Sequence, residues 1–281
     1  MASALLIYPW IYDFAAYDLW LKLLGLLYIA SILRKLAIKV NFIDCLDRYH
    51  ESLSPSLGNS VSEKKYGCGT YYYEEVEKPQ LLKKFPRKYK RYGLPVQFFL
   101  EEIGKLSTPD IILVSSGMTY WYPGAFETIK TLKVKFPEVP IILGGTYATL
   151  CYQHALESSG ADYVFKGGDL GRLIRLVEEI TGADFSKGKL PLDSFSYPYP
   201  AYDLYRRNEY VAIRTSMGCP FRCTYCAVNL LNGKFEQRKP ELVVREIEHF
   251  HKNLSVKNFV FYTILYCSMN RNISGESLSL Y

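Results

Sequence analysis

The sequence predicts an α/β protein built on a parallel sheet. Through the first 170 residues, short apolar runs that suit buried strands alternate with longer segments whose apolar residues recur at helical spacing. Strands joined by helical crossovers at this spacing form parallel sheets covered on both faces. A further strand runs directly into a cysteine-rich loop in the last third of the chain, and it predicts a second α/β unit.

The first elements follow from local composition. Ala4–Tyr8 is a short apolar strand, and the Tyr-, Trp- and Asp-rich segment Pro9–Trp20 indicates a loop. Leu23–Lys35 has helical periodicity, and Lys39–Ile43 returns to an apolar strand. The stretch Asp44–Lys90 is rich in Ser, Gly, Tyr and charge, which indicates a long loop region.

The same alternation continues to residue 181. The further strands expected are Asp110–Ser115, Ile141–Leu143 and Asp162–Phe165, and the further helices are Gln97–Lys105, Ala125–Phe136, Thr149–Ser158 and Leu170–Thr181. Ligands of such sheets bind outside the carboxyl ends of the strands. The loops Pro9–Trp20, Met118–Gly124 and Gly144–Thr149 are therefore expected at the functional edge.

Composition narrows the class of protein. A chain of 281 residues with 49% apolar and 22% charged residues fits a soluble globular protein of two modest domains. Seven cysteines, an odd number, argue against a secreted disulfide scaffold, so we expect a cytoplasmic protein. The apolar stretch Leu19–Leu36 is bracketed by charges and is shorter than a bilayer needs, which favours a buried helix over a membrane anchor and predicts no membrane partner.

Much of the net charge of +6 lies in the segment Lys83–Tyr92, where basic and aromatic residues interleave. This pattern is compatible with a nucleic-acid footprint. The alternative is a solvated connector, and the isolation of the patch favours it. We therefore do not expect a nucleic-acid partner.

The second unit begins after a Ser-, Gly- and Pro-containing linker, Asp184–Pro200. The strand Tyr210–Ser216 feeds the cysteine loop, Pro240 suits the first turn of a helix through about His251, and Lys257–Thr263 is another strand. In (β/α) barrels catalytic groups sit in loops after strand carboxyl ends, which is where the cysteines fall.

Cys219, Cys223 and Cys226 are separated by three and then two residues, so all three thiolates can reach one metal centre from a single loop. Four cysteines close a structural zinc site, whereas three leave one position open, and an iron–sulfur cube held by three cysteines keeps one iron free. The spacing favours the cluster. The alternative is a zinc knuckle with a distant fourth ligand, the candidates being His249, His251 and Cys267.

The Cys-x3-Cys-x2-Cys spacing, with Tyr225 before the last cysteine, resembles the signature of radical S-adenosylmethionine enzymes. The resemblance implies a 4Fe–4S cluster on Cys219, Cys223 and Cys226, S-adenosylmethionine on the open iron, and an electron donor. It also implies that Phe221 and Tyr225 shield the cluster from water. The reaction is methyl transfer or another radical rearrangement, and the substrate and oligomeric state stay open.

The region Met1–Gly168 resembles the flavodoxin-like, cobalamin-binding domain that precedes the radical core in many of these enzymes. The resembling stretches are Leu23–Ala30, Met118–Gly124 and Leu143–Leu150. In the family, glycines at positions such as Gly144 and Gly145 let the backbone approach the cobalamin nucleotide tail, though a Gly-Gly pair also suits a tight turn.

Whether cobalamin binds stays open, because the chain lacks the Asp-x-His-x-x-Gly motif that supplies a cobalt ligand in other cobalamin proteins. Met118, Tyr120 and Trp121 are the candidates to press against the corrin, although aromatic residues at a sheet edge are also common packing. His154 is expected to be a helix-surface or satisfied buried residue rather than a ligand.

The resemblance weakens toward the carboxyl end. Relatives carry a glycine- or acid-bearing segment after the second barrel strand, whereas this chain has no acid from Thr263 to Asn270. Only about 55 residues follow Cys226, too few for the other strand–helix units of such a core, so we expect an incomplete barrel. The alternative is an intact small domain whose partner chain completes the barrel. The rival functions are an inactive binding module and a zinc-stabilised interaction protein. The expected organisation is a Rossmann-like domain over 1–183, a linker over 184–205, a partial radical core over 206–264 and a disordered tail over 265–281.

Overall fold

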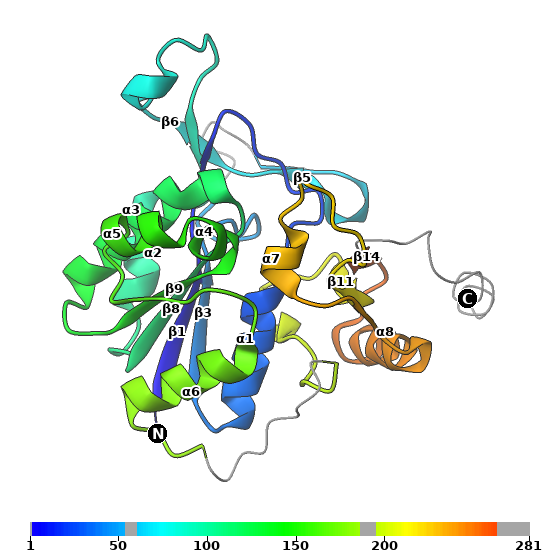
Figure 1. The fold of residues 1–281 in the computed structure, drawn as a ribbon. Coiled ribbons are helices and arrows are strands. Elements are labelled where there is room, and N and C mark those ends of the chain that lie inside the picture. The colour runs from blue at the N-terminus through cyan, green and yellow to red at the C-terminus, as the bar shows by residue number, and fades with distance from the viewer. Residues whose placement is uncertain (1, 54–60, 186–194, 263–281) are drawn as a thin grey trace.

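A parallel five-stranded sheet organises the first part of the chain (Figure 1). The computed structural model describes residues 2–53, 61–185 and 195–262. The sheet strands are β1 (Ser3–Tyr8), β3 (Lys39–Asp44), β8 (Ile111–Ser116), β9 (Ile141–Gly144) and β10 (Tyr163–Val164). Their spatial order is β10-β9-β8-β1-β3, and every pair is parallel. Along the chain this is the flavodoxin-like order 2-1-3-4-5, which confirms the predicted fold class.

Alternating side chains of each strand feed two separate cores. In β1, Leu5 and Ile7 face one core while Leu6 and Tyr8 face the other, as the two-residue period of a strand requires. The first core is covered by α2 (Val96–Gly104), α3 (Tyr122–Lys135), α4 (Gly145–Leu150) and α5 (Tyr152–Ser158), and the second by α1 (Leu24–Lys35) and α6 (Leu170–Thr181).

Helix α1 is buried on two sides. Ile32 and Leu33 pack on the sheet, while Leu27 and Tyr28 pack into a third core made with the carboxyl-terminal unit. A helix that is apolar nearly all round is a buried helix, which confirms the interpretation of Leu19–Leu36. Within the described residues, no helix has the length and apolarity needed to cross a bilayer.

The carboxyl-terminal unit is one strand–loop–helix–strand repeat, as predicted. Strand β11 (Val211–Arg214) pairs in parallel with β14 (Phe259–Tyr262), and α8 (Pro240–Leu254) connects them. A 3-10 turn, η5 (Tyr202–Leu204), packs beneath the pair, because Tyr202 both donates to the Ala212 carbonyl (3.0 Å) and accepts from the Ala212 N–H (2.8 Å). The division into domains stays a prediction, because the third core joins α1 to this unit.

A buried polar cluster lies between the two units. The carboxylate of Asp18 is 3.0 Å from the guanidinium of Arg48, and both side chains are buried. The hydroxyl of Tyr210, just before β11, donates to Asp18 at 2.9 Å. Because Asp18 follows β1 and Tyr210 precedes β11, this cluster fixes the loop after β1 against the second unit.

Asp44 and Lys22 extend the cluster. Burial raises the pKa of Asp44 to about 7, while the nearby Lys22 ammonium acts in the opposite direction. Burial likewise lowers the pKa of Lys22, whose Nζ lies 3.7 Å from the centroid of the Tyr205 ring. Each group therefore offsets part of the other's desolvation.

Two expectations were wrong in detail. The region expected as a loop contains short strands, of which β6 (Tyr73–Glu75) and β7 (Lys90–Tyr92) join β2 (Ile11–Asp13) in an antiparallel sheet. Other short elements in the same region are β4 (Ser62–Glu63), β5 (Gly69–Thr70), η2 (Lys65–Gly67) and η3 (Gln80–Leu82). The expected helix Thr149–Ser158 is instead two helices, α4 and α5, separated at Cys151. The expected tail 265–281 lies outside the described residues.

Candidate functional site

The cysteine loop is closed at its base by backbone pairing. Strand β12 (Ser216–Met217) pairs antiparallel with β13 (Glu236–Gln237), so the chain between them forms a closed excursion directly after β11. It contains the three cysteines and a short helix, α7 (Val228–Asn232). The loop therefore starts at the carboxyl end of a parallel strand, as predicted.

Gly218 makes this closure possible. Its φ is +66°, and a Cβ there would lie 2.4 Å from the carbonyl oxygen of Lys234 on the returning segment. Both the left-handed backbone and the close approach exclude a side chain. The structure thus explains the glycine immediately before Cys219.

The three cysteines share this loop but differ in exposure. Cys219 is half-buried at the base, whereas Cys223 and Cys226 are exposed and joined by a turn in which the Cys226 N–H donates to the Cys223 carbonyl at 3.0 Å. Across the described ranges, no three His, Cys, Asp or Glu side chains are grouped so as to hold a metal ion. The thiols are therefore near one another in the chain but do not converge in this structure.

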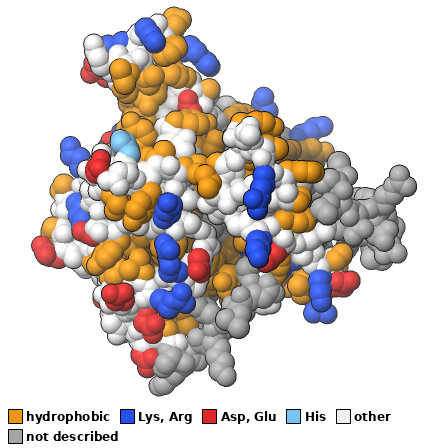
Figure 2. Space-filling view, viewed as in Figure 1, with side chains coloured by type: hydrophobic (Ala, Val, Ile, Leu, Met, Phe, Trp, Pro, Cys, Tyr) orange, Lys and Arg blue, Asp and Glu red, His pale blue; other side chains and the backbone are white. Residues whose placement is uncertain are grey.

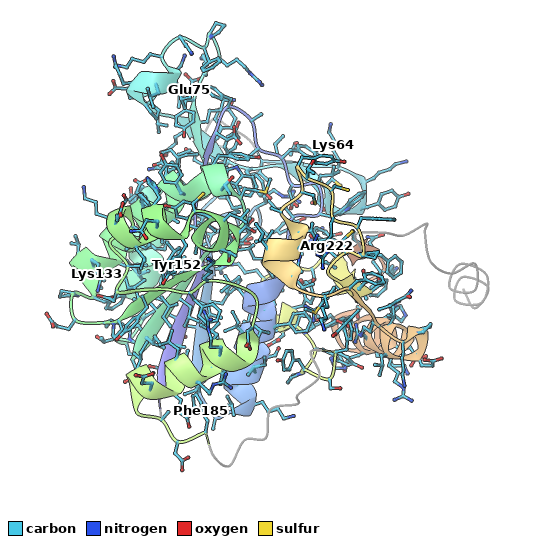
Figure 3. The ribbon with its side chains drawn as sticks, in the orientation of Figure 1. Lys64, Glu75, Lys133, Tyr152, Phe185 and Arg222 are labelled. Carbon is cyan, nitrogen blue, oxygen red and sulfur yellow. The ribbon has the colours of Figure 1, made fainter. Side chains whose placement is uncertain are left out.

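The two aromatic residues that were expected to shield a cluster, Phe221 and Tyr225, are exposed to solvent. Tyr225 is 91% exposed, and Phe221 is also exposed, while Asn229 of α7 donates to the Phe221 carbonyl at 2.9 Å. Arg222, labelled in Figure 3, lies in the same exposed part of the loop. The role of Tyr225 beside a cluster stays a prediction.

A buried ion pair supports the base of the loop, and sequence inspection missed it. Arg238 follows β13 and pairs with Glu246 of α8, and both side chains are buried. The Arg238 N–H donates to the Thr215 carbonyl at 2.9 Å, which ties the end of the loop to its beginning. Burial raises the pKa of Glu246, and the Arg238 guanidinium acts against that rise.

A cavity of about 510 Å³ opens beside the loop, at the carboxyl ends of β11 and β14. One wall comes from the amino-terminal unit, and the others come from the second unit. Its lining residues are Leu19, Trp20, Leu21, Leu24, Arg214, Ser216, Met217, Gly218, Asn232, Val260, Phe261 and Tyr262. The volume lies within the range of small-molecule sites, and the lining is mostly apolar with one cation, as such sites commonly are.

The loop after β1 is held at this cavity by Tyr262. Its hydroxyl donates to the Trp20 carbonyl and accepts from the Lys22 N–H at 3.3 Å. Trp20 adopts a φ of +61°, which is uncommon for a large side chain, and its indole donates to the Tyr66 carbonyl at 3.0 Å. No sequence signal marked the contacts of Tyr262, since they join residues more than 200 positions apart.

The amino-terminal candidates lie at the predicted edge of the sheet. Met118 and Tyr120 are exposed after β8, and Trp121 donates to Asp13 at 3.1 Å, which bridges the loops after β8 and β1. These two loops flank the point where the strand order reverses, which is where ligands of such sheets bind.

The two glycines of this edge differ. A Cβ on Gly144 would meet no heavy atom within 4 Å, so this glycine leaves space beside the sheet. A Cβ on Gly145 would lie 2.5 Å from the Ser116 carbonyl, and the φ of Gly145 is +92°. Close packing against β8 is therefore a sufficient reason for a glycine at this position, without any ligand.

The histidines considered as ligands have other partners. His154 is exposed on α5, the first of the two expected alternatives, and its Nδ1 lies 2.5 Å from the Tyr147 hydroxyl. On α8, His251 contacts the Val256 carbonyl at 2.9 Å, and His249 contacts the Asn253 amide at 3.0 Å. Cys267 lies outside the described residues.

The fold resembles that of a radical S-adenosylmethionine methyltransferase. No family model matches the chain. The chain is 25% identical over 199 residues to an uncharacterized methyltransferase of Pyrococcus horikoshii, covering 60% of this chain and 43% of that protein. It is 22% identical over 178 residues to the anaerobic magnesium-protoporphyrin IX monomethyl ester cyclase of Synechocystis, covering 54% of this chain and 36% of that protein.

A solved structure shows the same fold. The radical S-adenosylmethionine methyltransferase TsrM of Kitasatospora setae matches 93% of this chain with a TM-score of 0.57, at 14% identity. The match covers 47% of that chain. The chain thus spans less than half the length of the relatives it matches.

Proposed function

We propose that this chain carries the cluster loop and the S-adenosylmethionine cavity of a radical S-adenosylmethionine methyltransferase. The observation that supports this most directly is the placement of Cys219, Cys223 and Cys226 in a closed loop after β11, beside the cavity. An electron donor completes the proposed system.

The residues fit a 4Fe–4S cluster in donor type and in their spacing along one loop. Thiolates are the usual ligands of such clusters, and three of them leave one iron for an exogenous ligand. Convergence requires the exposed thiols of Cys223 and Cys226 to turn toward Cys219, which β12–β13 pairing holds at the base. When bound, the cluster supplies the electron that cleaves S-adenosylmethionine.

The chain's own residues then have positioning roles. Gly218 and the Arg238–Glu246 pair hold the two ends of the loop together. Leu19 and Trp20 give the cavity an apolar wall on the side of the amino-terminal unit, and Arg214 supplies the cavity's cation for an anionic group. The guanidinium of Arg214 is stacked over the Tyr28 ring at 4.6 Å, which limits its movement.

Cobalamin is proposed to bind at the edge of the five-stranded sheet, between the carboxyl ends of β1 and β8, where the strand order reverses. Exposed Met118 and Tyr120, together with the space beside Gly144, would receive it. Methyl transfer is proposed over other radical rearrangements, because a methyltransferase is among the relatives and TsrM shares the fold.

Anaerobic reconstitution with iron and sulfide tests the cluster. We expect about four iron and four sulfide per chain, and a strong loss of both in Cys226→Ala. Cys151→Ala is the matched control, because Cys151 lies at the α4–α5 break and outside the three-cysteine motif. Equal iron in Cys226→Ala and the parent would exclude the assignment, and zinc retained without sulfide would favour the structural alternative.

Cleavage of S-adenosylmethionine under reduction separates an enzyme from a binding module. Formation of 5′-deoxyadenosine or S-adenosylhomocysteine by the reconstituted chain, absent in Cys226→Ala, supports the enzyme. A loaded cluster with no product supports the binding module.

A further inference from the structure

An arm, residues 76–89, projects from the body between β6 and β7 (Figure 1). Its stem is ordered by internal contacts. Lys88 pairs with Glu75 at 2.6 Å across the stem, and the Lys78 ammonium donates to the Phe85 carbonyl at 2.7 Å. Arg91 at the foot of the stem pairs with Glu127 of α3 at 3.4 Å. The arm is therefore built to stand away from the sheet.

The end of the arm is apolar and exposed. Leu81 is 85% exposed and Phe85 is 44% exposed, which leaves two large apolar side chains in water on one projection. Figure 2 shows apolar side chains gathered with basic ones on this projection. The Phe85 ring packs edge-on against Phe14, with the ring centroids 6.1 Å apart, but nearly half of its side chain stays in water, and Leu81 is almost fully exposed. A partner surface would cover both exposed areas.

The same arm is strongly basic. It carries five cations and one carboxylate, a net charge of +4 in a chain whose total is +6. Lys84 lies beside the apolar end, with its Nζ 5.5 Å from the centroid of the Phe85 ring. Lys83 pairs with Glu77 at 3.2 Å, so the single carboxylate is already engaged. The partner surface is therefore anionic.

The exposure of the aromatic residues distinguishes a nucleic acid from a membrane as the anionic partner. The sequence interleaves aromatic and basic residues, but Tyr89 and Tyr92 are buried, so that only Phe85 of this segment faces solvent. Single-stranded nucleic acids are bound by aromatic platforms on which successive bases stack, and Leu81 offers no such face. An apolar tip surrounded by lysines matches the boundary between lipid headgroups and acyl chains instead.

We propose that the arm is a contact for the surface of an anionic membrane. Leu81 and Phe85 enter the headgroup region, while Lys84 and Arg87 meet the lipid phosphates. The proposed contact lies at the membrane surface and needs no spanning helix, and the described residues contain none. A single arm with this charge gives reversible, salt-sensitive binding.

Sedimentation of the full chain with vesicles tests the proposal. The probes are vesicles of phosphatidylcholine alone and of phosphatidylcholine with phosphatidylglycerol. We expect binding to the anionic vesicles only, reduced at ~1 M salt. Leu81→Asp and Lys84→Glu should each weaken binding by about tenfold, because each removes one of the two contributions.

Matched controls change equivalent side chains elsewhere. Val134→Asp on α3 replaces an apolar side chain that is 80% exposed, and Lys252→Glu on α8 reverses an exposed charge. Both should bind as the parent does, and circular dichroism establishes that all variants are folded. Equal binding by arm and control variants, or no preference for anionic vesicles, overturns the proposal. Tighter binding to a labelled oligonucleotide than to vesicles overturns it in favour of nucleic acid.

Discussion

Replacing Glu246 by glutamine is expected to destabilise the carboxyl-terminal unit, because it leaves the guanidinium of Arg238 buried without its counter-charge. The side chains of the pair are 0% and 3% exposed, so water cannot take the place of the lost partner. Breaking a buried ion pair costs about 3–5 kcal/mol. The Thr215 carbonyl, bound by the Arg238 N–H, would then lose its fixed position at the start of the loop.

Arg238→Met removes the other partner, and its effect should depend on pH. Burial already raises the pKa of Glu246, and without Arg238 that pKa rises further. The folded state then holds a proton that the unfolded state releases, so the loss of stability is small in acid and grows as pH rises above the ordinary glutamate range. Replacing both residues, as Arg238→Met with Glu246→Leu, should restore most of the parent stability.

Urea unfolding at several pH values measures these changes. The exposed pair of Lys252 and Glu248, 4.0 Å apart, is the control, and Glu248→Gln should cost less than about 0.5 kcal/mol. If Glu246→Gln costs no more than this control, or if the double variant loses the sum of the two single losses, the pair does not hold the loop as described.

Three further outcomes are expected. Gly218→Ala should lower the free energy of unfolding, measured in urea, by at least ~2 kcal/mol and should lower the reconstituted iron by half or more. Gly182 is the control, because it has a similar φ of +64° but no heavy atom lies within 4 Å of an added Cβ. Gly182→Ala should lower the free energy of unfolding by about 1 kcal/mol and leave the iron content unchanged. Since Asp44 has a pKa of about 7 in the folded state, stability should fall by roughly 2–4 kcal/mol as pH rises from about 4 to about 7, and Asp44→Asn should flatten that slope in thermal melts. Tyr210→Phe removes the bond to Asp18 and should cost about 1 kcal/mol by urea titration, and no loss would mean that this bond does not fix the interface.

Elements defined by local pattern could be predicted from sequence. The strands of the parallel sheet are continuous apolar runs, and the loop of three cysteines directly follows a strand, as its sequence context predicted. The short strands β6 and β7 could not be predicted, because they are stabilised by pairing with β2 and not by their own composition.

Contacts between distant residues also escaped prediction. Arg238 and Glu246 carry no motif, and their pairing depends on how α8 packs behind β11. The basic segment was correctly recognised as charged, but only the structure separates the outward lysines from the inward Tyr89 and Tyr92.

Helix α1 contributes side chains to the cores of both units, so the chain cannot be cut between them without exposing apolar surface. Leu27 and Tyr28 lose their cover if the chain is cut between the units, and so do Val211 and Ile213 on the other side. An isolated sheet domain would expose the apolar side of α1 to solvent and would self-associate. A chimera that transplants this sheet must therefore carry β11 and α8 with it, because the folding unit is larger than the sheet.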